Sequence, residues 1–319
     1  MSRLPVAIGL TLGVLADELL GDPRRGHPVA GFGTAAAALE RRLYRDSRRA
    51  GAQYTAACVL PVLATAALVE RRTAPRPALR TVTIAAATWT VIGGRSLRRV
   101  ATELAAALNQ NDTEAARAKI PSLCGRDPEQ LDANGLTRAT VESVAENTSD
   151  SVTAPLFWGA VAGLPGLLGY RAVNTLDAMV GHRSPRYARF GTAAARLDDL
   201  ANLAPARLTA VLTVALAGRV GGSPAQAFRV WRSDAAAHPS PNAGQCEAAA
   251  AGALGVTLGG LTSYRSHTEN RPILGIGLAP QPADIARATK LSHLVQYATL
   301  AVLLAALHLQ EQARRAKRK

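Results

Sequence analysis

Three stretches of the 319-residue chain contain no Asp, Glu, Lys or Arg over 20 residues each: Ala50–Val69, Ser151–Tyr170 and Leu291–Gln310. An α-helix of about 20 apolar residues is long enough to cross the hydrocarbon core of a bilayer. Shorter apolar runs, among them Leu4–Ala16 and Thr81–Gly94, bring the expected number of spans to roughly four to six. No run alternates between apolar and polar residues as paired strands would. The predicted fold class is therefore all-α, a polytopic helical membrane protein.

The basic residues support this interpretation. The chain carries a net charge of +14, and its arginines and lysines form short clusters beside the apolar stretches, as is typical of membrane proteins. The segments 22–49 and 95–150 each hold seven basic residues, and we expect both to be cytoplasmic loops of a multi-pass protein in the cytoplasmic membrane. No known nucleic-acid-binding module accompanies the charge, so nucleic acid is not an expected partner.

We expect one membrane-embedded domain over residues 1–319, with two additions. A soluble helical insertion is predicted at about 95–150, where leucine and valine recur at helical spacing until a polar run at 109–112 ends the pattern. A basic C-terminal tail is predicted at 311–319. The three cysteines are widely separated and lack CxxC spacing, which argues against a disulfide framework and against a zinc site.

Acidic residues lie on one helical stripe just before the second uncharged stretch. Glu142, Glu146 and Asp150 are spaced by four residues with no basic residue among them, so their charges repel. A divalent cation would relieve the repulsion, and hard oxygen ligands suit Mg²⁺ and its phosphate partners. Pairing with arginines elsewhere in the fold is the alternative. Asp22, four residues after Glu18, is a further candidate metal ligand, unless it only marks a helix end in water.

A second polar group follows that stretch. Arg171, Asn174 and Asp177 repeat every three residues on one helical face. Further charged and amide side chains come soon after them: Arg196, Asp198, Asp199, Asn202 and Arg207. Arginine forks are typical holders of phosphate or carboxylate groups, and aspartates beside an asparagine are typical of a metal cradle. Salt bridges between helices would use the same residue types.

A third polar group, His238–Glu247, opens an alanine-rich helix. Ser240 or Asn242 can cap that helix, whose exposed amides would favour a bound anion. Capping does not account for His238 or Glu247. The chain has no glycine-rich phosphate loop, nucleophile elbow or H-E-x-x-H motif. From the residues alone we predict a membrane-embedded, Mg²⁺-assisted site for substrates that carry phosphate or carboxylate.

At these positions the sequence resembles the adenosylcobinamide-phosphate synthases of cobalamin biosynthesis. Five motifs follow one another in the order found in that family: Leu19–Pro23 with His27–Val29; Glu142–Thr148 with Asp150 and Ala154–Phe157; Tyr170–Asp177 with Met179–Gly181; Ala195–Asp199 with Asn202 and Pro205–Leu208; and His238–Gly244. The chain departs from the family pattern at Gln245 and Cys246, where an aromatic residue and proline are expected, and at His182, where tyrosine is frequent. These departures bear on substrate fit more than on the reaction.

The resemblance implies a membrane-bound ligase. The enzyme would form an amide between adenosylcobyric acid and (R)-1-amino-2-propanol O-phosphate, or a related aminoalcohol, to give adenosylcobinamide phosphate. It implies ATP, because a carboxylate needs activation, with an acyl phosphate as the simplest route, and Mg²⁺ with the nucleotide. Expected partners are the corrinoid and aminoalcohol phosphate substrates, membrane lipid, and other enzymes of the corrinoid pathway.

Roles for individual residues are hypotheses. Catalytic candidates are Glu142, Glu146, Asp177 and His238, with His27 as another group that could take the proton of the attacking ammonium. Candidates for binding substrate or phosphate are Arg171, Asn174, Arg196, Asn202, Arg207, Asn242 and Asn147. Candidate metal ligands are Asp150, Asp198, Asp199 and Asp22.

Two other functions would use similar residues. An aspartate-rich membrane transferase acting on diphosphates relies on the same pairing of carboxylates with Mg²⁺. A carrier for corrinoids or phosphorylated compounds could use the charged middle of the chain as its pathway. The dense block of acidic residues and arginines favours an enzyme over a carrier.

The stretch Ser151–Tyr170 separates the first two polar groups. A straight helix across the bilayer would leave those groups on opposite sides of the membrane. The stretch contains Pro155, Gly163 and Pro165, which can interrupt or turn a helix. We therefore predict a re-entrant or broken helix at 151–170 that brings both polar groups together.

Overall fold

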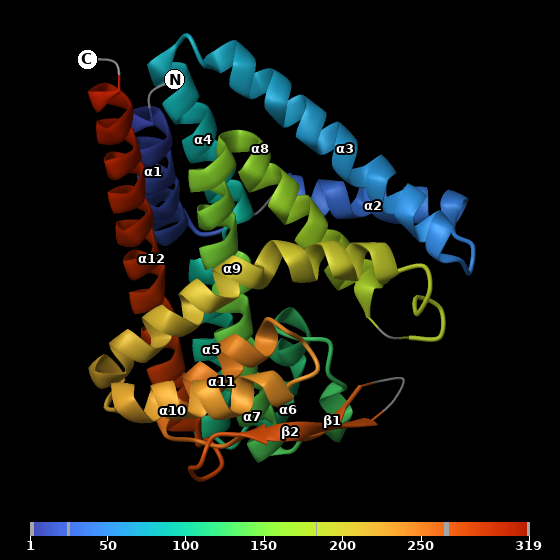
Figure 1. Cartoon of the computed structure of the whole chain (residues 1–319). Helices are drawn as coiled ribbons and strands as arrows, with labels where there is room; N and C mark the ends of the chain where they lie inside the picture. Colours follow the sequence, from blue (N-terminus) through green and yellow to red (C-terminus); the bar gives the residue numbers. More distant parts are fainter. Residues whose placement is uncertain (1–2, 24–25, 183, 265–267, 318–319) are drawn as a thin grey trace. The chain divides into compact units, whose positions relative to one another are not determined.

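The computed structural model of the chain, which describes residues 3–23, 26–182, 184–264 and 268–317, is mostly helical (Figure 1). The chain forms two compact units. Unit 1 comprises Met1–Gly93, Ala154–Asn202 and Leu300–Lys319, and unit 2 comprises Gly94–Thr153 and Leu203–Thr299. The expected organisation, one domain with a soluble insertion at about 95–150, stays a prediction.

The elements divide between the units as follows. Unit 1 contains α1 (Leu4–Leu20), α2 (Pro28–Leu43), α3 (Arg48–Thr73), α4 (Pro77–Val91) and α8 (Ala154–Leu176). Unit 2 contains α5 (Gly94–Asn109), α6 (Thr113–Lys119), α7 (Ala133–Thr148), α10 (Pro224–Asp234), α11 (Ala243–Leu254) and a hairpin of β1 (Leu258–Ser263) and β2 (Thr268–Leu274). Helices α9 (Thr192–Leu216) and α12 (Pro282–Ala316) contribute residues to both units.

In the described part of the chain, four helical stretches are long and apolar enough to cross a membrane: Arg48–Thr73, Ala133–Gly181, Thr192–Val220 and Pro282–Ala316. Three of them contain the uncharged stretches that the sequence marked as spans. The fourth is visible in the sequence only as a short apolar run at 208–218. The predicted fold class, a polytopic helical membrane protein, is confirmed.

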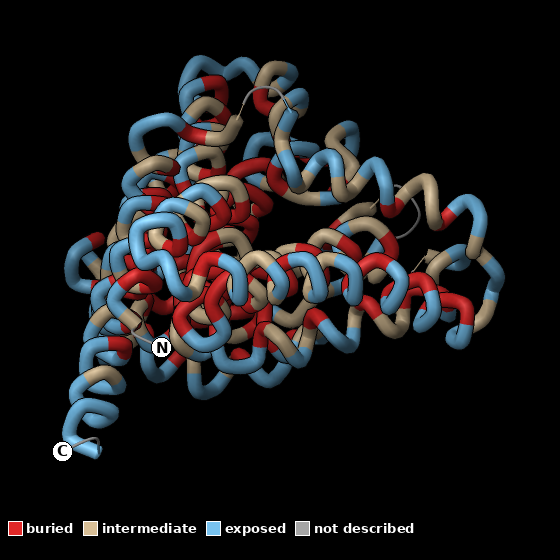
Figure 2. Tube along the Cα trace, turned by 90° about the horizontal axis from the view of Figure 1, so that it is seen from above, coloured by how far each residue is buried: buried red, intermediate tan, exposed pale blue. Residues whose placement is uncertain are grey.

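In unit 1, close contact between α1 and α4 depends on glycine. A Cβ atom added at Gly9 would lie 2.8 Å from the side chain of Ile84, and one added at Gly13 would lie 2.3 Å from Cβ of Thr88. Small residues let helix backbones approach closely, which is how membrane helices gain packing energy. The last turns of α12 are exposed (Figure 2) and carry Arg314 and Arg315 from the predicted basic tail, and Lys317 follows the helix. Arg318 and Lys319 lie outside the described residues.

Helix α8 is broken at Gly163, where φ is 64° and ψ is −142°. Glycine reaches this conformation readily, whereas other residues do so only with strain. Pro165, two residues later, has no N–H to donate within the helix. The predicted break in the helix at 151–170 is therefore confirmed, and Gly163 marks its position. That the break brings the two flanking polar groups together stays a prediction.

The backbone groups released by the break have side-chain partners. Arg3 donates from Nη1 to the carbonyl oxygens of Ala160 (3.4 Å) and Val161 (3.5 Å). The carboxylate of Glu70 accepts from the N–H of Leu164 at 3.3 Å. Glu70 is itself held by Arg80, whose Nε lies 2.8 Å from Oε1. Because unpaired backbone groups are costly in an apolar environment, these side chains make the break tolerable.

Unit 2 begins with the amphipathic helix predicted near 97–108. Leu97, Leu104 and Leu108 of α5 are buried, and the polar run that ends the pattern leads to Asp112, which accepts from the N–H of Ala115 and caps α6. The hairpin β1–β2 contacts α7, α10 and α11 (Figure 1). The sequence did not predict the hairpin, because two glycines and a proline hide any strand alternation.

Replacement of Gly163 by Ala tests the break in α8. An alanine at position 163 would have to adopt a positive φ, and its Cβ would lie 3.2 Å from the Glu70 carboxylate. We therefore expect Gly163→Ala to lower the free energy of unfolding by about 1–3 kcal/mol. Thermal unfolding of the purified protein in detergent measures this. Gly31→Ala in α2, where the Cβ meets open space, is the matched control and should not destabilise. If the two variants had the same Tm, position 163 would not require glycine and the break would not lie there.

Candidate functional site

The residues singled out in the sequence fall in both units. Unit 1 holds Asp22, Arg171, Asn174, Asp177, Arg196, Asp198, Asp199 and Asn202. Unit 2 holds Glu142, Glu146, Asn147, Asp150, Arg207, His238 and Asn242. Each unit brings some of its own candidates together.

In unit 2, a buried ion pair joins α7 to the segment before it and to the hairpin. The side chain of Glu142 is 2% exposed and that of Arg126 is 5% exposed. Oε2 of Glu142 accepts from Nη2 of Arg126, and Oε1 accepts from the N–H of Gly259 at 2.7 Å. Both carboxylate oxygens therefore have partners. For Glu142, the alternative to a bound metal ion is therefore realised, because it pairs with an arginine from another segment of the fold.

A second buried group lies around Glu247 on α11, whose side chain is 1% exposed. Nη1 of Arg271, on β2, lies 3.7 Å from Oε1 of Glu247, and Nε2 of His238 lies 3.8 Å from Oε2. Both distances exceed those of hydrogen bonds. Both Glu247 oxygens and Nε2 of His238 are buried with no hydrogen-bond partner among the described residues. Buried polar atoms of this kind are rare and indicate a place for a water, ion or ligand group.

The surroundings of Glu247 favour its neutral form. Burial raises the pKa of Glu247 well above its ordinary range, and the charges of Glu142 and Glu146 raise it further. Arg271 and Arg126 act in the opposite direction. A carboxyl group whose pKa is raised in this way can exchange a proton closer to neutral pH than an exposed glutamate.

His238 is held in one orientation. Its Nδ1 accepts a hydrogen bond from the N–H of Ser240 at 3.0 Å, which assigns the proton of the neutral ring to Nε2, on the side of Glu247. Burial lowers the pKa of His238, and the charge of Arg271 lowers it further, so the ring is neutral at neutral pH. His238 can therefore donate toward Glu247.

The other candidates of unit 2 differ in their surroundings. Glu146 is partly buried and interacts electrostatically with Arg271, Arg126 and Glu142, so it belongs to the same charged group. Asn147 donates to the carbonyl oxygen and hydroxyl of Ser143, at 2.9 and 3.0 Å, which fixes it along α7.

Three further candidates of unit 2 lie on or near its helices. Asp150 lies in a π-helical turn (Ser149–Thr153) and acts electrostatically on Cys246. Asn242 is buried, and Ser240 rather than Asn242 caps α11 by accepting from the N–H of Ala243 at 3.1 Å. Arg207 is exposed and donates to the carbonyl oxygen of Leu203.

In unit 1, α8 and α9 share a hydrogen-bonded chain of side chains. Nη1 of Arg171 donates to Asn174 at 3.2 Å, and Asn174 donates to Asp198 at 3.3 Å. Asn202 donates to the other oxygen of Asp198 at 2.9 Å and accepts from the hydroxyl of Tyr170 at 2.9 Å. Four of the predicted residues thus meet, and Tyr170 closes the chain.

The remaining candidates of unit 1 are more dispersed. Arg196 is exposed, and Asp22 and Asp199 are partly buried. Asp177 packs over the backbone of Gly181, where any added Cβ would come within 1.8 Å of its Oδ1.

Metal binding receives no support from the protein groups alone. Within the described residues, no three side chains of His, Cys, Asp or Glu converge so that they could hold a metal ion. The proposed ligands Asp22, Asp198 and Asp199 belong to unit 1, and Asp150 belongs to unit 2. A magnesium ion that arrives with a nucleotide needs only one or two carboxylates, so Mg²⁺ stays a prediction.

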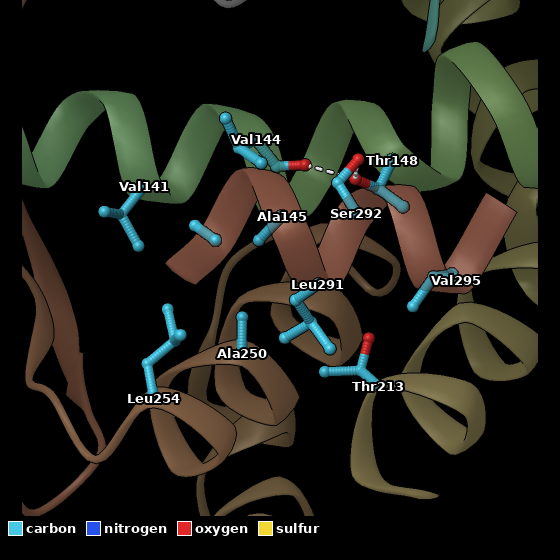
Figure 3. A pocket seen from close by; sticks show the side chains of 11 residues that line it. Val141, Val144, Ala145, Thr148, Thr213, Ala250, Leu254, Leu291, Ser292 and Val295 are labelled. Carbon is cyan, nitrogen blue, oxygen red and sulfur yellow. Dashed lines mark hydrogen bonds between the residues drawn. The ribbon is translucent and has the colours of Figure 1, made fainter. Parts of the chain in front are cut away.

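A small cavity in unit 2 lies between α7, α11, α12 and the end of α9 (Figure 3). Its volume of about 20 Å³ is enough for about one water molecule. Its lining is apolar except for a few hydroxyls, and those of Thr148 and Ser292 bond to each other at 2.7 Å. This cavity is a packing feature and is too small for a substrate.

Sequence reasoning missed the cationic half of the charged group in unit 2. Arg126 and Arg271 lie outside all of the predicted motifs. Tyr264 also lies outside them, and its hydroxyl accepts from Nη2 of Arg271 at 2.6 Å. Glu247 was noted but given no role. The signal in the sequence is its position, as the one charged residue of an alanine-rich helix.

Comparison with known proteins identifies relatives over almost the whole chain. Residues 10–292 match the family model described as "CobD/Cbib protein". "Cobalamin biosynthesis protein CobD" of Mycobacterium tuberculosis is 55% identical over 300 residues, which cover 93% of this chain and 95% of the relative. The proteins of the same name from Chromobacterium violaceum and Rhodobacter capsulatus are 42% and 43% identical, covering 94% and 91% of this chain and 96% and 92% of the relatives. No solved structure matches the chain.

A double-mutant cycle tests the buried pair of Arg126 and Glu142. Arg126→Met leaves the carboxylate of Glu142 buried without its partner, and we expect a loss of about 3–5 kcal/mol in the free energy of unfolding. Adding Glu142→Gln removes the charge but keeps an acceptor for the N–H of Gly259, so the double variant should be more stable than Arg126→Met alone. Denaturant unfolding in detergent measures each variant. Additive effects would show that the two charges are not coupled.

Proposed function

The chain belongs to the CobD/CbiB family of cobalamin biosynthesis proteins, and on this premise we propose that it is a ligase of the cytoplasmic membrane. Its reaction is the ATP-dependent formation of an amide between adenosylcobyric acid and (R)-1-amino-2-propanol O-phosphate, or a related aminoalcohol. The product is adenosylcobinamide phosphate. The family match supports the pathway, and the resemblance of the motifs supports the substrates.

Amide formation sets two chemical requirements. The carboxyl group must be activated, which ATP would supply, and the amine must lose a proton to expose its lone pair. The protein needs cationic groups that hold phosphates and a base that receives the proton. The base should have a pKa near the working pH and should be shielded from water.

Glu247 is the residue that we propose as the base. Its carboxylate is buried, has no hydrogen-bond partner among the described residues, and has a raised pKa. We assign to it the proton of the attacking ammonium. His238, which the sequence suggested as catalytic, becomes a positioning residue in this proposal, because its Nε2–H faces Glu247 and its Nδ1 is engaged by Ser240.

Arg271 controls access to Glu247. Its side chain is 18% exposed, compared with 1% for Glu247, so it is the member of the pair that reaches solvent. A phosphate or carboxylate of the substrate would attract the guanidinium group of Arg271. Movement of Arg271 toward that anion would uncover Glu247 and remove the positive charge that opposes its protonation.

The other predicted residues keep the roles that their chemistry suggests. Arg171, Arg196 and Arg207 are proposed to bind phosphates, with Asn174, Asn202, Asn242 and Asn147 orienting polar groups. Glu146 and Asp177 remain proposed catalytic residues, and Glu142 supports the site through Arg126. Asp22, Asp150, Asp198 and Asp199 remain proposed ligands of a nucleotide-bound Mg²⁺.

Mass spectrometry of the reaction product tests the proposed function. Purified protein given adenosylcobyric acid, ATP and aminopropanol phosphate should release adenosylcobinamide phosphate. We expect Glu247→Gln to lower kcat about 100-fold or more, since a general base contributes about 10²–10⁴. Glu129→Gln makes the same chemical change at an exposed position of unit 2 and should retain activity. Turnover of prenyl diphosphates, or corrinoid transport without ATP-dependent ligation, would favour the alternatives.

The pH dependence of kcat/KM tests the role of Glu247 separately. A base must be ionised to act, so the rate should rise with pH through the raised pKa of Glu247. The acidic limb of the profile should therefore lie well above pH 4.5, the ordinary range of a glutamate. His238→Gln should shift this limb, and Glu247→Gln should abolish it. A limb that is unchanged in Glu247→Gln would assign the proton to another group.

A further inference from the structure

One end of unit 1 gathers arginines around a cavity of about 350 Å³. Its lining includes Arg3, Arg80 and Arg314, with Glu70 as the acidic member of the described lining. The beginning of α1, the turn between α3 and α4 and the end of α12 meet at this end of the unit (Figure 1). The volume is within the range of ligand pockets, about 300–1,000 Å³.

The cavity has an excess of positive charge. Three arginines and one glutamate line it, and that glutamate is paired with Arg80 and accepts from the N–H of Leu164. A second glutamate, Glu311 of the adjoining cavity, accepts from the backbone N–H of Arg3 at 3.0 Å, so the arginines still outnumber the acidic groups. Nε of Arg3 is buried with no hydrogen-bond partner among the described residues. Burial, together with the charges of Arg314 and Arg80, lowers the pKa of Arg3. A bound anion would relieve this repulsion and could accept from Arg3.

An apolar groove adjoins the arginines. A second cavity, of about 440 Å³, also reaches Arg3. Leu4, Ala7, Leu304 and Leu307, from α1 and α12, form its apolar part, and His308, Glu311, Gln312 and Arg315 form its polar rim. It continues along an exposed apolar stripe of α1, formed by Leu4, Ile8, Leu12 and Leu15, which are 42–60% exposed. A stripe of this kind is unfavourable in water but suits the acyl chains of a lipid.

We propose that this end of unit 1 is a binding site for an anionic phospholipid. The phosphate group lies among Arg3, Arg80 and Arg314, and the acyl chains lie in the groove between α1 and α12. A soluble phosphate compound would pair with the arginines but would leave the groove empty. A zwitterionic lipid would fill the groove with its acyl chains but would not supply net negative charge. Basic pockets between membrane helices recognise anionic head groups in this way.

The site also bears on the fold. Arg3 holds the carbonyl oxygens of Ala160 and Val161 at the break in α8, and Glu70 holds the N–H of Leu164. A lipid phosphate on Arg3 would therefore order the residues that satisfy the break. We expect anionic phospholipid to stabilise the protein independently of the proposed reaction.

The experiment compares lipids added to the full chain purified in detergent. Dioleoyl phosphatidylglycerol and dioleoyl phosphatidylcholine are added separately, retained lipid is measured by native mass spectrometry, and stability is measured by thermal unfolding. We expect preferential retention of phosphatidylglycerol and a rise in Tm with that lipid. Glycerol phosphate and inorganic phosphate, at the same concentration, form the soluble-anion arm.

Variants connect the effect to the arginines. Arg3→Gln and Arg314→Gln should each weaken phosphatidylglycerol binding about fivefold, the effect of losing one arginine near a lipid surface. Arg72→Gln removes the same charge from an exposed position that does not line the cavity, and should bind as the wild-type protein does. Arg3 also supports the break in α8. If the Arg3→Gln variant fails to fold for that reason, the lipid affinity of Arg314→Gln decides whether the arginines bind the lipid phosphate.

Three outcomes would overturn the proposal. Equal retention of phosphatidylcholine would remove the selectivity for charge. Full stabilisation by glycerol phosphate or inorganic phosphate would identify a soluble anion as the ligand. Wild-type affinity in Arg314→Gln would place the lipid elsewhere. None of these readouts depends on ligase activity, so the proposed function could fail while the lipid site stands, or the reverse.

Discussion

The pairing of Glu142 with Arg126 and with the backbone of Gly259 is the interaction on which unit 2 depends. One buried carboxylate joins α7, the segment that carries Arg126, and strand β1. Burying charges costs several kcal/mol per ion, and mutual attraction with added hydrogen bonds offsets that cost. Both oxygens of Glu142 have partners, whereas Nη1 of Arg126 is buried with none among the described residues. A buried pair is therefore weak as a source of stability, but it specifies one arrangement because every other arrangement leaves a charge unpaired. Here it fixes the hairpin that carries Arg271 to the neighbourhood of Glu247.

The same principle, that every buried polar group needs a partner, explains unit 1. A helix can break inside an apolar unit only where side chains replace the lost backbone hydrogen bonds. Arg3 and Glu70 do so at Gly163, and Arg80 neutralises Glu70. The arginines that the break requires also leave a surplus of positive charge at that end of the unit. The structural need and the proposed lipid site thus share Arg3 and Arg80, whereas Arg314 belongs to the proposed site alone.

The sequence was informative where a physical requirement is local. Uncharged stretches of 20 residues predicted three of the four candidate spans, and glycine with proline predicted the break in α8. The hairpin was not predictable by alternation, because Gly259 and Gly260 adopt positive φ at a bulge and Pro272 interrupts β2. Only the acidic residues of the charged group in unit 2 were predictable from the sequence. Glu142 and Glu146 stand out by spacing, but Arg126 and Arg271 become their neighbours only through the fold, and arginine is too abundant in this chain to select them by type.

Burial without a partner distinguishes Glu247 from Glu142, although both are acidic residues on helices of the same unit. Each carboxylate oxygen of Glu142 has a hydrogen-bond partner, so removing its charge lowers the free energy of unfolding. Glu247 has an arginine and a histidine within 3.8 Å, yet neither reaches hydrogen-bond distance. A fold that satisfies one carboxylate completely could have satisfied the other with a small shift of Arg271. Leaving Glu247 unsatisfied costs stability, and such a cost is commonly retained at sites where a ligand supplies the missing contacts. The unsatisfied carboxylate is therefore a stronger indication of function than the regular spacing of Glu142, Glu146 and Asp150.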